Sequence, residues 1–374
     1  MNIYIDNTDV WDGFEAQKYW VHPKTYDARK KKEECKNYVL SGAYWGSRKM
    51  DGAWNMIIRD MDGNYHMRSR TAGVDGSFTD KAEWVPQIIE CLDMPNGSAV
   101  IGEIYLPNDE GSRKITSILN CLKEKCLQRQ KERAYLHFYA FDIVAWDGKM
   151  ITSLPFKDRI FKYLYKNFKS CVNGDYVEIA EYKNGQELWD MYGEILAAGG
   201  EGIVITQENT KYLCGKRQAR STIKLKKELT DTIDAFYDGD YKPAKKLSDT
   251  TRPELWEYWL NEKTGEKADT NKFFEQCNGE PWVPITKAYY FGWASAISFS
   301  VMKDGKPYHI GYISGITEEV KAGVVNNPEE WIGKVAELSA MEIENINGQY
   351  SLRHGKIVQW RTKKKEDCDF SQIC

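Results

Sequence analysis

The chain has 374 residues and a mass of 43.3 kDa, which corresponds to two or three domains of about 150 residues each. Apolar residues make up 42% and charged residues 29% of the sequence, proportions that exclude an intrinsically disordered protein. No stretch approaches the roughly 18 apolar residues of a membrane span, and the first residues, MNIYIDNTDV, lack the basic start of a secretory signal. We therefore expect a soluble, cytoplasmic protein with no membrane partner.

The nine cysteines occur singly, with no CxxC pair. An odd number without paired spacing argues against a disulfide framework and against a zinc ribbon. We therefore expect reduced thiols.

The net charge of −3 conceals two cationic segments. Between Thr206 and Leu229 seven cations accompany only two acids, and six cations with no acid lie between residues 353 and 365. Such clusters suit a phosphate-rich partner, because neutralising phosphates releases their counterions. A solvated surface would also explain either segment alone, so the interpretation depends on neighbouring motifs.

In the first part of the chain, short apolar or alternating runs bounded by turn residues predict strands at 53–60, 65–70, 99–106, 136–146 and 201–206. Apolar residues at steps of three and four predict a helix over 113–133. A second predicted helix, 186–198, should end at Gly199 and Gly200, since glycine suits a left-handed cap. Strands and helices without a regular βαβ rhythm predict an α+β domain.

After Lys227 the pattern changes to strands and turns. Residues 285–301 and 308–316 predict two strands around the turn KDGKP, and residues 334–345 and 350–362 give two further runs. These runs predict a small five-stranded barrel. A polar stretch at about 238–284 reads as an insertion with one short helix near 253–262. We therefore expect one domain at 1–228 and a second at 229–374.

Five short motifs follow one another: Lys49-Met50-Asp51-Gly52, Gly102-Glu103-Ile104, Phe141-Asp142-Ile143-Val144, Glu201-Gly202-Ile203-Val204 and Lys224-Leu225-Lys226. Each motif alone also fits an ordinary turn or strand end. In this order, and with the C-terminal SLRHGKIVQWRTKKKED, they resemble the nucleotidyltransferase motifs of the ATP-dependent DNA ligases. The resemblance covers the chain from about Val39 to Asp369 apart from the insertion. It implies a nucleotidyltransferase (adenylation) domain followed by an OB-fold β-barrel domain, ATP and Mg²⁺ as cofactors, and a monomer that seals nicked duplex DNA.

Lys49 is the candidate catalytic nucleophile. A lysine amine attacks phosphorus only when it is neutral, and neighbouring cations favour the neutral form. Arg48 and the lysines at 224–227 are the cations that we expect beside it. Gly52 should let the backbone approach a nucleotide closely, and Asp51 should orient neighbouring groups.

Two carboxylates and two lysines extend the candidate site. A carboxylate in an apolar strand is costly unless it meets a cation, a metal or a hydroxyl. The resemblance implies that Glu103 lies near the ribose and the metal, and that Glu201 helps to hold the divalent ion. Lys224 and Lys226 alternate with apolar residues, so both ammonium groups share one strand face and suit phosphate.

The resemblance also implies roles for other residues. Ser47 would read the adenine edge, Phe141 would stack on adenine, and Arg70 would contact a phosphate or the ribose. Near the C-terminus, Arg361 and Lys364 would orient the ATP phosphates. Contacts to the DNA backbone would come from Arg217, Arg220, Arg353 and Lys356. The chain departs from the family at Trp54, where an arginine is usual, and at Gly355 and Lys363 in the last motif.

Two alternatives remain open. RNA ligases and mRNA guanylyltransferases share the lysine nucleophile and the central motifs, although the ending SLRHGKIVQWR favours a DNA ligase. The other alternative is an inactive nucleic-acid-binding protein with an OB fold. The presence of Lys49, Glu103, Glu201 and Lys224 argues against it.

Overall fold

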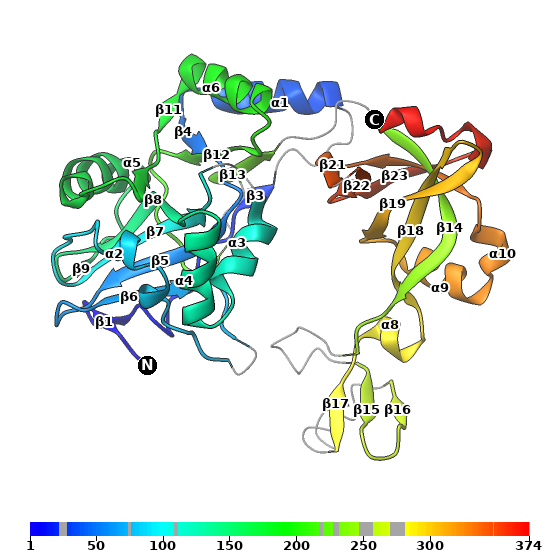
Figure 1. The fold of residues 1–374 in the computed structure, drawn as a ribbon, viewed down its shortest axis with the longest axis horizontal. Helices are drawn as coiled ribbons and strands as arrows, with labels where there is room; N and C mark the ends of the chain where they lie inside the picture. Colours follow the sequence, from blue (N-terminus) through cyan, green and yellow to red (C-terminus); the bar gives the residue numbers. More distant parts are fainter. Residues whose placement is uncertain are drawn as a thin grey trace. The chain divides into compact units, whose positions relative to one another are not determined.

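The computed structural model describes residues 1–21, 28–73, 76–107, 111–216, 220–226, 232–246, 257–269, 281–346 and 348–373. The chain forms two compact units, Met1–Lys227 and Glu228–Cys374. The first is an α+β unit and the second is rich in β-strands (Figure 1). No helix in the described ranges is long and apolar enough to span a membrane.

The larger sheet of the first unit has the strand order β10-β8-β7-β5-β6, with β9 paired to β8. Its strands are β5 (Ala53–Arg59), β6 (Tyr65–Ser69), β7 (Ser98–Tyr105), β8 (His137–Trp146), β9 (Lys149–Met150) and β10 (Val177–Ile179). One face packs on helices α2 (Pro86–Ile89), α3 (Gly111–Leu119), α4 (Lys123–Glu132) and α5 (Phe156–Asp158) and on η2 (Arg159–Asn167). The other face packs on N-terminal residues around β1 (Tyr4–Ile5) and β2 (Thr8–Asp9), where Trp11 and Phe14 are buried.

The second sheet has the order β11-β4-β12-β13-β3. Its strands are β3 (Trp20–Val21), β4 (Tyr44–Arg48), β11 (Lys183–Asn184), β12 (Gly202–Gln207) and β13 (Thr222–Lys226). Helices α1 (Ala28–Leu40) and α6 (Gly185–Ala197) lie side by side on one face (Figure 1). Ile203 and Ile205 of β12 and Ile223 and Leu225 of β13 are buried against these helices. The alternate residues of both strands therefore point to the other face of the sheet.

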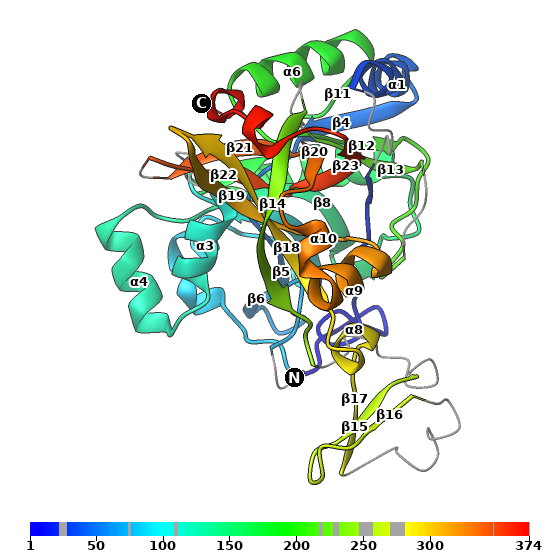
Figure 2. The ribbon, with the colours of Figure 1, turned by 90° about the vertical axis from the view of Figure 1, so that its right-hand side faces the viewer.

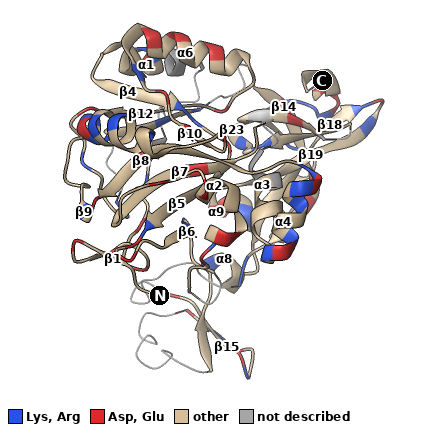
Figure 3. Ribbon diagram, turned by 60° about the vertical axis from the view of Figure 1, so that its left-hand side comes forward, with Lys and Arg blue, Asp and Glu red and all other residues tan. Residues whose placement is uncertain are grey.

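Helix α6 ends as the sequence predicts. Gly199 has φ +84°, and the N–H groups of Gly199 and Gly200 donate to the carbonyls of Leu196 and Ile195. This pair of bonds is a Schellman motif, which satisfies carbonyls that the helix leaves unpaired. The helix carries three acidic residues and no lysine or arginine, whereas α4 carries both signs (Figure 3).

The five predicted strands of the first unit are confirmed as β5, β6, β7, β8 and β12. The prediction of one helix over 113–133 is wrong, because α3 and α4 are separate. Leu122 between them has extended backbone (ψ 149°) and is 75% exposed. Ile118 of α3 and Cys126 of α4 are both buried. The helical spacing of apolar residues therefore holds in each helix, but it does not reveal the break between them.

The second unit contains a sheet with the order β19-β18-β14-β20-β23. Its strands are β14 (Ile233–Pro243), β18 (Ala294–Lys303), β19 (Lys306–Ser314), β20 (Val335–Ser339) and β23 (Lys356–Arg361), accompanied by the hairpin of β21 (Glu342–Ile346) and β22 (Gln349–Arg353). The predicted runs 334–345 and 350–362 thus each divide into two strands. Helices α9 (Glu318–Asn326) and α10 (Pro328–Trp331) pack on β18 and β14 (Figure 2).

The insertion between β14 and β18 differs from its prediction. Strand β14 continues to Pro243, and a small sheet of β15 (Trp259–Asn261), β16 (Lys267–Ala268) and β17 (Trp282–Pro284) extends beyond the end of β14 and β18 (Figure 2). The helix predicted near 253–262 is wrong where it is described, because the buried Trp259 lies in a strand; residues 253–256 lie outside the described residues. The strand predicted from residue 285 begins only at Ala294, since Thr286 caps the short helix α8 (Lys287–Tyr290).

Candidate active site

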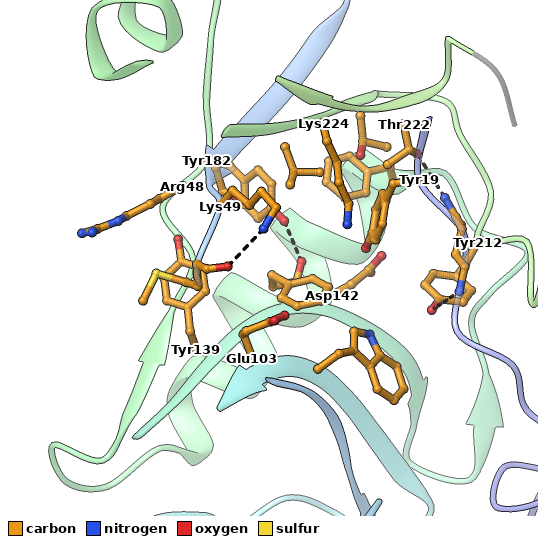
Figure 4. Close-up of a pocket in the computed structure, with 18 of the residues that line it drawn as sticks. Tyr19, Arg48, Lys49, Glu103, Tyr139, Asp142, Tyr182, Tyr212, Thr222 and Lys224 are labelled. Carbon is orange, nitrogen blue, oxygen red and sulfur yellow. Dashed lines mark hydrogen bonds between the residues drawn. The ribbon is translucent and has the colours of Figure 1, made fainter. Parts of the chain in front are cut away.

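A pocket in the first unit lies between the two sheets (Figure 4). Residues of β4, β5, β7, β8, β12 and β13 line it, together with N-terminal residues, residues of α5 and η2, and side chains from four loops. The lining includes six of the residues that the sequence singles out: Ser47, Lys49, Arg70, Glu103, Phe141 and Lys224. Motifs that lie far apart in the chain therefore meet in one place.

Lys49 follows β4 and is tied to the motif that begins at Glu201. The Lys49 backbone N–H donates to the Gly202 carbonyl at 2.8 Å. The Lys49 ammonium forms an ion pair with Oε2 of Glu201, while the Lys226 ammonium lies 3.1 Å from Oε1 of the same carboxylate. The Glu201 side chain is only 6% exposed, so one buried carboxylate is shared by two lysines.

The expected cationic surroundings of Lys49 are corrected in one respect. The Arg48 side chain is exposed and points away from the Lys49 ammonium (Figure 4). The charged group in direct contact with Lys49 is instead the Glu201 carboxylate. An ammonium in an ion pair has no free lone pair, so the Lys49 amine must leave Glu201 before it can act as a nucleophile.

Gly52 is required by strand packing rather than by a nucleotide. A Cβ atom at this position would lie 2.3 Å from the Ile104 carbonyl oxygen and 2.5 Å from Cγ of Glu103. Any other residue would push β5 away from β7, on which Glu103 stands. The glycine of this motif therefore helps to position Glu103 in the pocket.

Glu103 reaches into the pocket from β7 and has no hydrogen bond or ion pair within the described ranges. Burial raises the pKa of its carboxyl group to about 7; nearby Lys49 and Lys224 oppose this rise and Glu201 adds to it. An unpartnered carboxyl group in a pocket is costly in the absence of a ligand. Its position suits a hydroxyl group or a cation.

Lys224 is a cation of the pocket whose charged form is disfavoured by burial, as is that of Glu103. Burial lowers the pKa of its ammonium to about 8, with Lys49, Lys226 and Arg70 adding to the shift. No carboxylate of the described residues forms an ion pair with it. Arg70 stands at the rim and donates to the Gln17 carbonyl at 3.4 Å. The pocket thus holds two cations, Lys224 and Arg70, that form no ion pair with an acid of the described residues, which suits an anion.

Ser47 and Phe141 mark another part of the pocket. Ser47 is buried on β4, and Phe141 is half-buried on β8. The Tyr182 hydroxyl donates to the Phe141 carbonyl at 2.7 Å, which fixes the strand beside the ring. The residue after Phe141 on β8 is Asp142, and Arg159 donates to both of its carboxylate oxygens at 2.9 Å. Although burial alone would lower the pKa of Arg159, Asp142 raises it, so the Arg159 guanidinium stays charged.

Sequence reasoning missed several lining residues: Gln17, Tyr19, Arg159, Tyr182, Tyr212 and Thr222. A signal existed only for Arg159, since the buried Asp142 of the third motif requires a cationic partner. Trp54, which replaces the usual arginine, also lines the pocket and is 8% exposed. It contributes apolar surface there instead of a charge.

Two cations near the C-terminus, Arg361 and Lys363, form ion pairs within the second unit. The cations between 353 and 365 have no acid among them in sequence, but acids of other strands meet them. Arg361 lies 2.7 Å from Oε2 of Glu337 and 3.4 Å from Oδ1 of Asp234, and Lys363 lies 2.6 Å from Oδ2 of Asp234. Lys364 is exposed.

The candidate DNA-binding residues also differ from one another. Arg353 is 19% exposed and faces Glu344 at 3.6 Å, whereas Lys356 is exposed. Arg220 is exposed immediately before β13, where its backbone has φ +64°. Arg217 lies outside the described residues.

The described part of the chain contains no cluster of three or more His, Cys, Asp and Glu residues that could hold a metal. Glu103 and Glu201 are close enough for their charges to interact. Mg²⁺ is usually bound through one or two carboxylates together with substrate phosphates and water. The two carboxylates therefore fit a Mg²⁺ ion that arrives with a phosphate-bearing ligand.

Comparison with known proteins agrees with this arrangement. Residues 28–226, more than half of the chain, match the sequence model of the ATP dependent DNA ligase domain. The chain belongs to the ATP-dependent DNA ligase domain family. Lys49, Glu103, Glu201 and Lys224 all lie within the matched range of this ligase-family chain.

Two relatives are archaeal DNA ligases. The DNA ligase of Methanocorpusculum labreanum is 29% identical over 153 residues, which are 40% of this chain and 27% of that protein. DNA ligase 2 of Methanosarcina mazei is 29% identical over 202 residues, 51% of this chain and 34% of that protein. The match therefore spans about a third or less of these relatives.

Solved structures show the same fold over most of the chain. A Lig E DNA ligase, studied for DNA binding with a minimal scaffold, superposes with a TM-score of 0.54 at 15% identity over 93% of this chain and 99% of that one. A structure named Pmar-Lig gives a TM-score of 0.56 at 14% identity and covers 94% of this chain and 68% of its own. An adenylation domain followed by a β-rich domain is thus the architecture of this ligase-family chain.

Proposed function

We propose that this ligase-family chain uses ATP to adenylylate Lys49 and then seals nicks between a 5′-phosphate and a 3′-hydroxyl in duplex DNA. The observation that carries the proposal is the pocket itself. It brings Lys49, Glu103 and Lys224 together, with Glu201 paired to Lys49, from four separate strands and their ends.

In the first step the Lys49 amine attacks the α-phosphorus of ATP. A nitrogen–phosphorus bond forms, the bond to the bridging oxygen breaks, and pyrophosphate leaves. Lys224, which remains mostly protonated at pH 7 with a pKa of about 8, holds the α-phosphate oxygens against the attacking amine. Phe141 stacks on adenine, Ser47 meets its edge, and Arg70 contacts the ribose or a phosphate.

In the second step an oxygen of the DNA 5′-phosphate attacks the same phosphorus, and the Lys49 amine leaves. In the third step the 3′-hydroxyl attacks the 5′-phosphate, and AMP leaves. A Mg²⁺ ion held by Glu201 and Glu103 would neutralise charge that builds up on the phosphoryl oxygens. Glu201 would thereby have two uses, because it pairs with Lys49 in this structure and would help to hold the ion when one is bound.

The remaining cations supply phosphate contacts. Lys226, paired with Glu201 at the site, contributes charge toward the nucleotide or the DNA end. Arg361 and Lys364 orient the β- and γ-phosphates in the first step. Arg217, Arg220, Arg353 and Lys356 hold the DNA backbone without reading base sequence.

Incubation with α-labelled ATP or GTP tests the proposal. We expect the label from ATP to become covalently attached to the chain, and the labelled protein to seal a nicked DNA duplex. Label from GTP would indicate a guanylyltransferase, and sealing only of nicks that carry RNA would indicate an RNA ligase. No label from either nucleotide on a folded protein would indicate an inactive binding module.

A further inference from the structure

A segment that precedes the matched ligase domain forms part of the nucleotide pocket. Gln17 and Tyr19 both line it, although the family match begins only at residue 28. Neither residue belongs to any of the ligase motifs. Their contribution therefore has to be judged from their contacts alone.

The segment is held firmly on the N-terminal side of Tyr19. Gln17 is 5% exposed, and its side-chain amide donates to Oγ1 of Thr222 at 3.1 Å and accepts from the Leu213 N–H at 2.9 Å. Its backbone N–H donates to the Tyr212 hydroxyl at 3.0 Å. These three hydrogen bonds fix the backbone and the side chain of Gln17 within the protein.

The segment is also held on the C-terminal side. Strand β3 pairs in parallel with β13, with Trp20 opposite Ile223 and Val21 opposite Lys224. Tyr19 lies directly between this strand pairing and the Gln17 anchor. Its backbone is therefore fixed at the pocket wall, and only its side chain is available for a ligand.

The Tyr19 side chain lies beside Lys224. The Lys224 ammonium is 4.9 Å from the centre of the Tyr19 ring, within the range of a cation–π contact. Figure 4 shows the two side chains next to each other, with the tyrosine hydroxyl directed into the pocket. That hydroxyl has no hydrogen-bond partner among the residues that the structure describes.

The electrostatic surroundings keep this hydroxyl protonated. Burial raises the pKa of Tyr19, and the nearby Asp142 and Glu103 raise it further. The group is therefore a hydrogen-bond donor throughout the physiological pH range. A donor that points into the pocket without a partner among the described residues, beside an ammonium that forms no ion pair with them, suits an oxygen atom of an anionic ligand.

We infer that Tyr19 is a nucleotide-binding residue of this site. Its ring holds the Lys224 ammonium in place, and its hydroxyl donates a hydrogen bond to a ribose or phosphate oxygen of ATP. The inference rests on the proposed function, which it extends by a residue from outside the matched domain. Gln17 is the positioning residue that fixes Tyr19 in the wall.

Equilibrium binding of ATP to the full-length protein tests the inference with Tyr19→Phe and Tyr19→Ala. Loss of one hydrogen bond should weaken ATP binding about 3- to 10-fold in Tyr19→Phe, and Tyr19→Ala should lose more because the contact with Lys224 also disappears. Tyr135→Phe and Tyr135→Ala are the matched controls, since Tyr135 is exposed in the same unit and outside the pocket. Their ATP affinity should not change.

Kinetics and thermal unfolding distinguish the loss of a contact between Tyr19 and ATP from a general loss of structure. In lysine adenylylation, Tyr19→Phe should raise KM for ATP with little change in kcat, and thermal unfolding should match the wild type.

Two outcomes would overturn the inference. One is unchanged ATP affinity in both Tyr19 variants. The other is tighter binding in Tyr19→Ala, which would show that the ring obstructs the pocket. Failure of the proposed function has a different signature: the wild-type chain would bind ATP without becoming labelled, while the affinities of the variants would still decide the role of Tyr19.

Discussion

Two cationic regions that look alike in sequence have different surroundings in the structure. In the first unit, Lys224 has no ion pair with a described residue, and burial lowers its pKa to about 8. In the second unit, Arg361 and Lys363 face Asp234, and Arg361 also faces Glu337. Cation density along a chain therefore does not reveal which cations are available to phosphate. Acids contributed by other strands decide that.

The difference also predicts how each region would respond to a ligand. The cations of the C-terminal ion pairs are exposed, whereas their acids Glu337 and Asp234 are only 11% and 15% exposed. A phosphate that binds these cations must therefore compete with carboxylates that have little access to water. Lys224 needs no exchange of partners, because no acid of the described residues forms an ion pair with it. The substitutions that follow test this contrast, in order of expected effect.

Lys49→Ala should abolish covalent labelling by ATP, because no other described side chain of the pocket occupies the position of the attacking amine. The variant should still seal a nick that already carries 5′-AMP, since that step follows the lysine intermediate. Gel detection of labelled protein and of sealed product measures both. Normal ATP-dependent sealing by this variant would remove Lys49 from the reaction.

Glu201→Ala should slow adenylylation by about 10²-fold or more, an effect typical of lost transition-state charge stabilisation. It should also raise the Mg²⁺ concentration needed for half-maximal rate. Glu208→Ala is the matched control, because Glu208 lies just beyond the same strand but pairs with Lys157 at the surface. A wild-type Mg²⁺ titration for Glu201→Ala would contradict the metal role.

Arg361→Ala should slow adenylylation from ATP by more than 10-fold, an effect of the size seen when a charge contact on a transferring phosphoryl group is lost. It should spare much of the sealing of a pre-adenylylated nick, where no pyrophosphate has to be oriented. Lys363→Ala is a sharp control, since it removes a cation from the same Asp234 but not from the proposed phosphate site. Equal losses in both assays for Arg361→Ala would show that this motif serves DNA instead of ATP.

Glu103→Gln should change the pH dependence of stability. The native carboxyl group keeps its proton up to about pH 7, whereas in the unfolded chain it loses the proton near 4.5. The native state thus binds more protons between these values, and the free energy of unfolding falls as pH rises through them. The fall from this group is at most about 3 kcal/mol, and Glu103→Gln should flatten it. Denaturant titrations at pH 5 and pH 8 give the free energy of unfolding at each pH and hence its change between them. An identical change in the wild type and in Glu103→Gln would show that Glu103 is not its source.

Much of this fold was predictable because its signals are local. Strands such as β5 and β7 were found from their apolar runs, and Gly199 marked the end of α6. The break at Leu122 was missed because the helical period resumes after it, and β15 was missed because its Trp259 reads equally well on a helix. In the site, the motif residues were found by resemblance. Tyr19, Tyr182 and the acids facing Arg361 were not, because their roles depend on contacts across the sheets that no local pattern records.

The smallest expected effect separates two cations within the C-terminal region. Lys356 is exposed, whereas Arg353 faces Glu344 and is 19% exposed. If Lys356 contacts a DNA phosphate, Lys356→Ala should lower the slope of log affinity against log salt by about 1, through the loss of one counterion-releasing contact. Arg353→Ala should lower it less, since its guanidinium is already partly neutralised by the protein.

Both variants should weaken binding to every nicked sequence alike, because phosphate contacts carry no base information. Titrations of two nicked duplexes of different sequence at several salt concentrations measure both effects. Equal changes of the salt slope in the two variants would mean that a neighbouring acid does not reduce the contribution of a cation to DNA binding. A preference for one duplex would contradict binding through the DNA backbone.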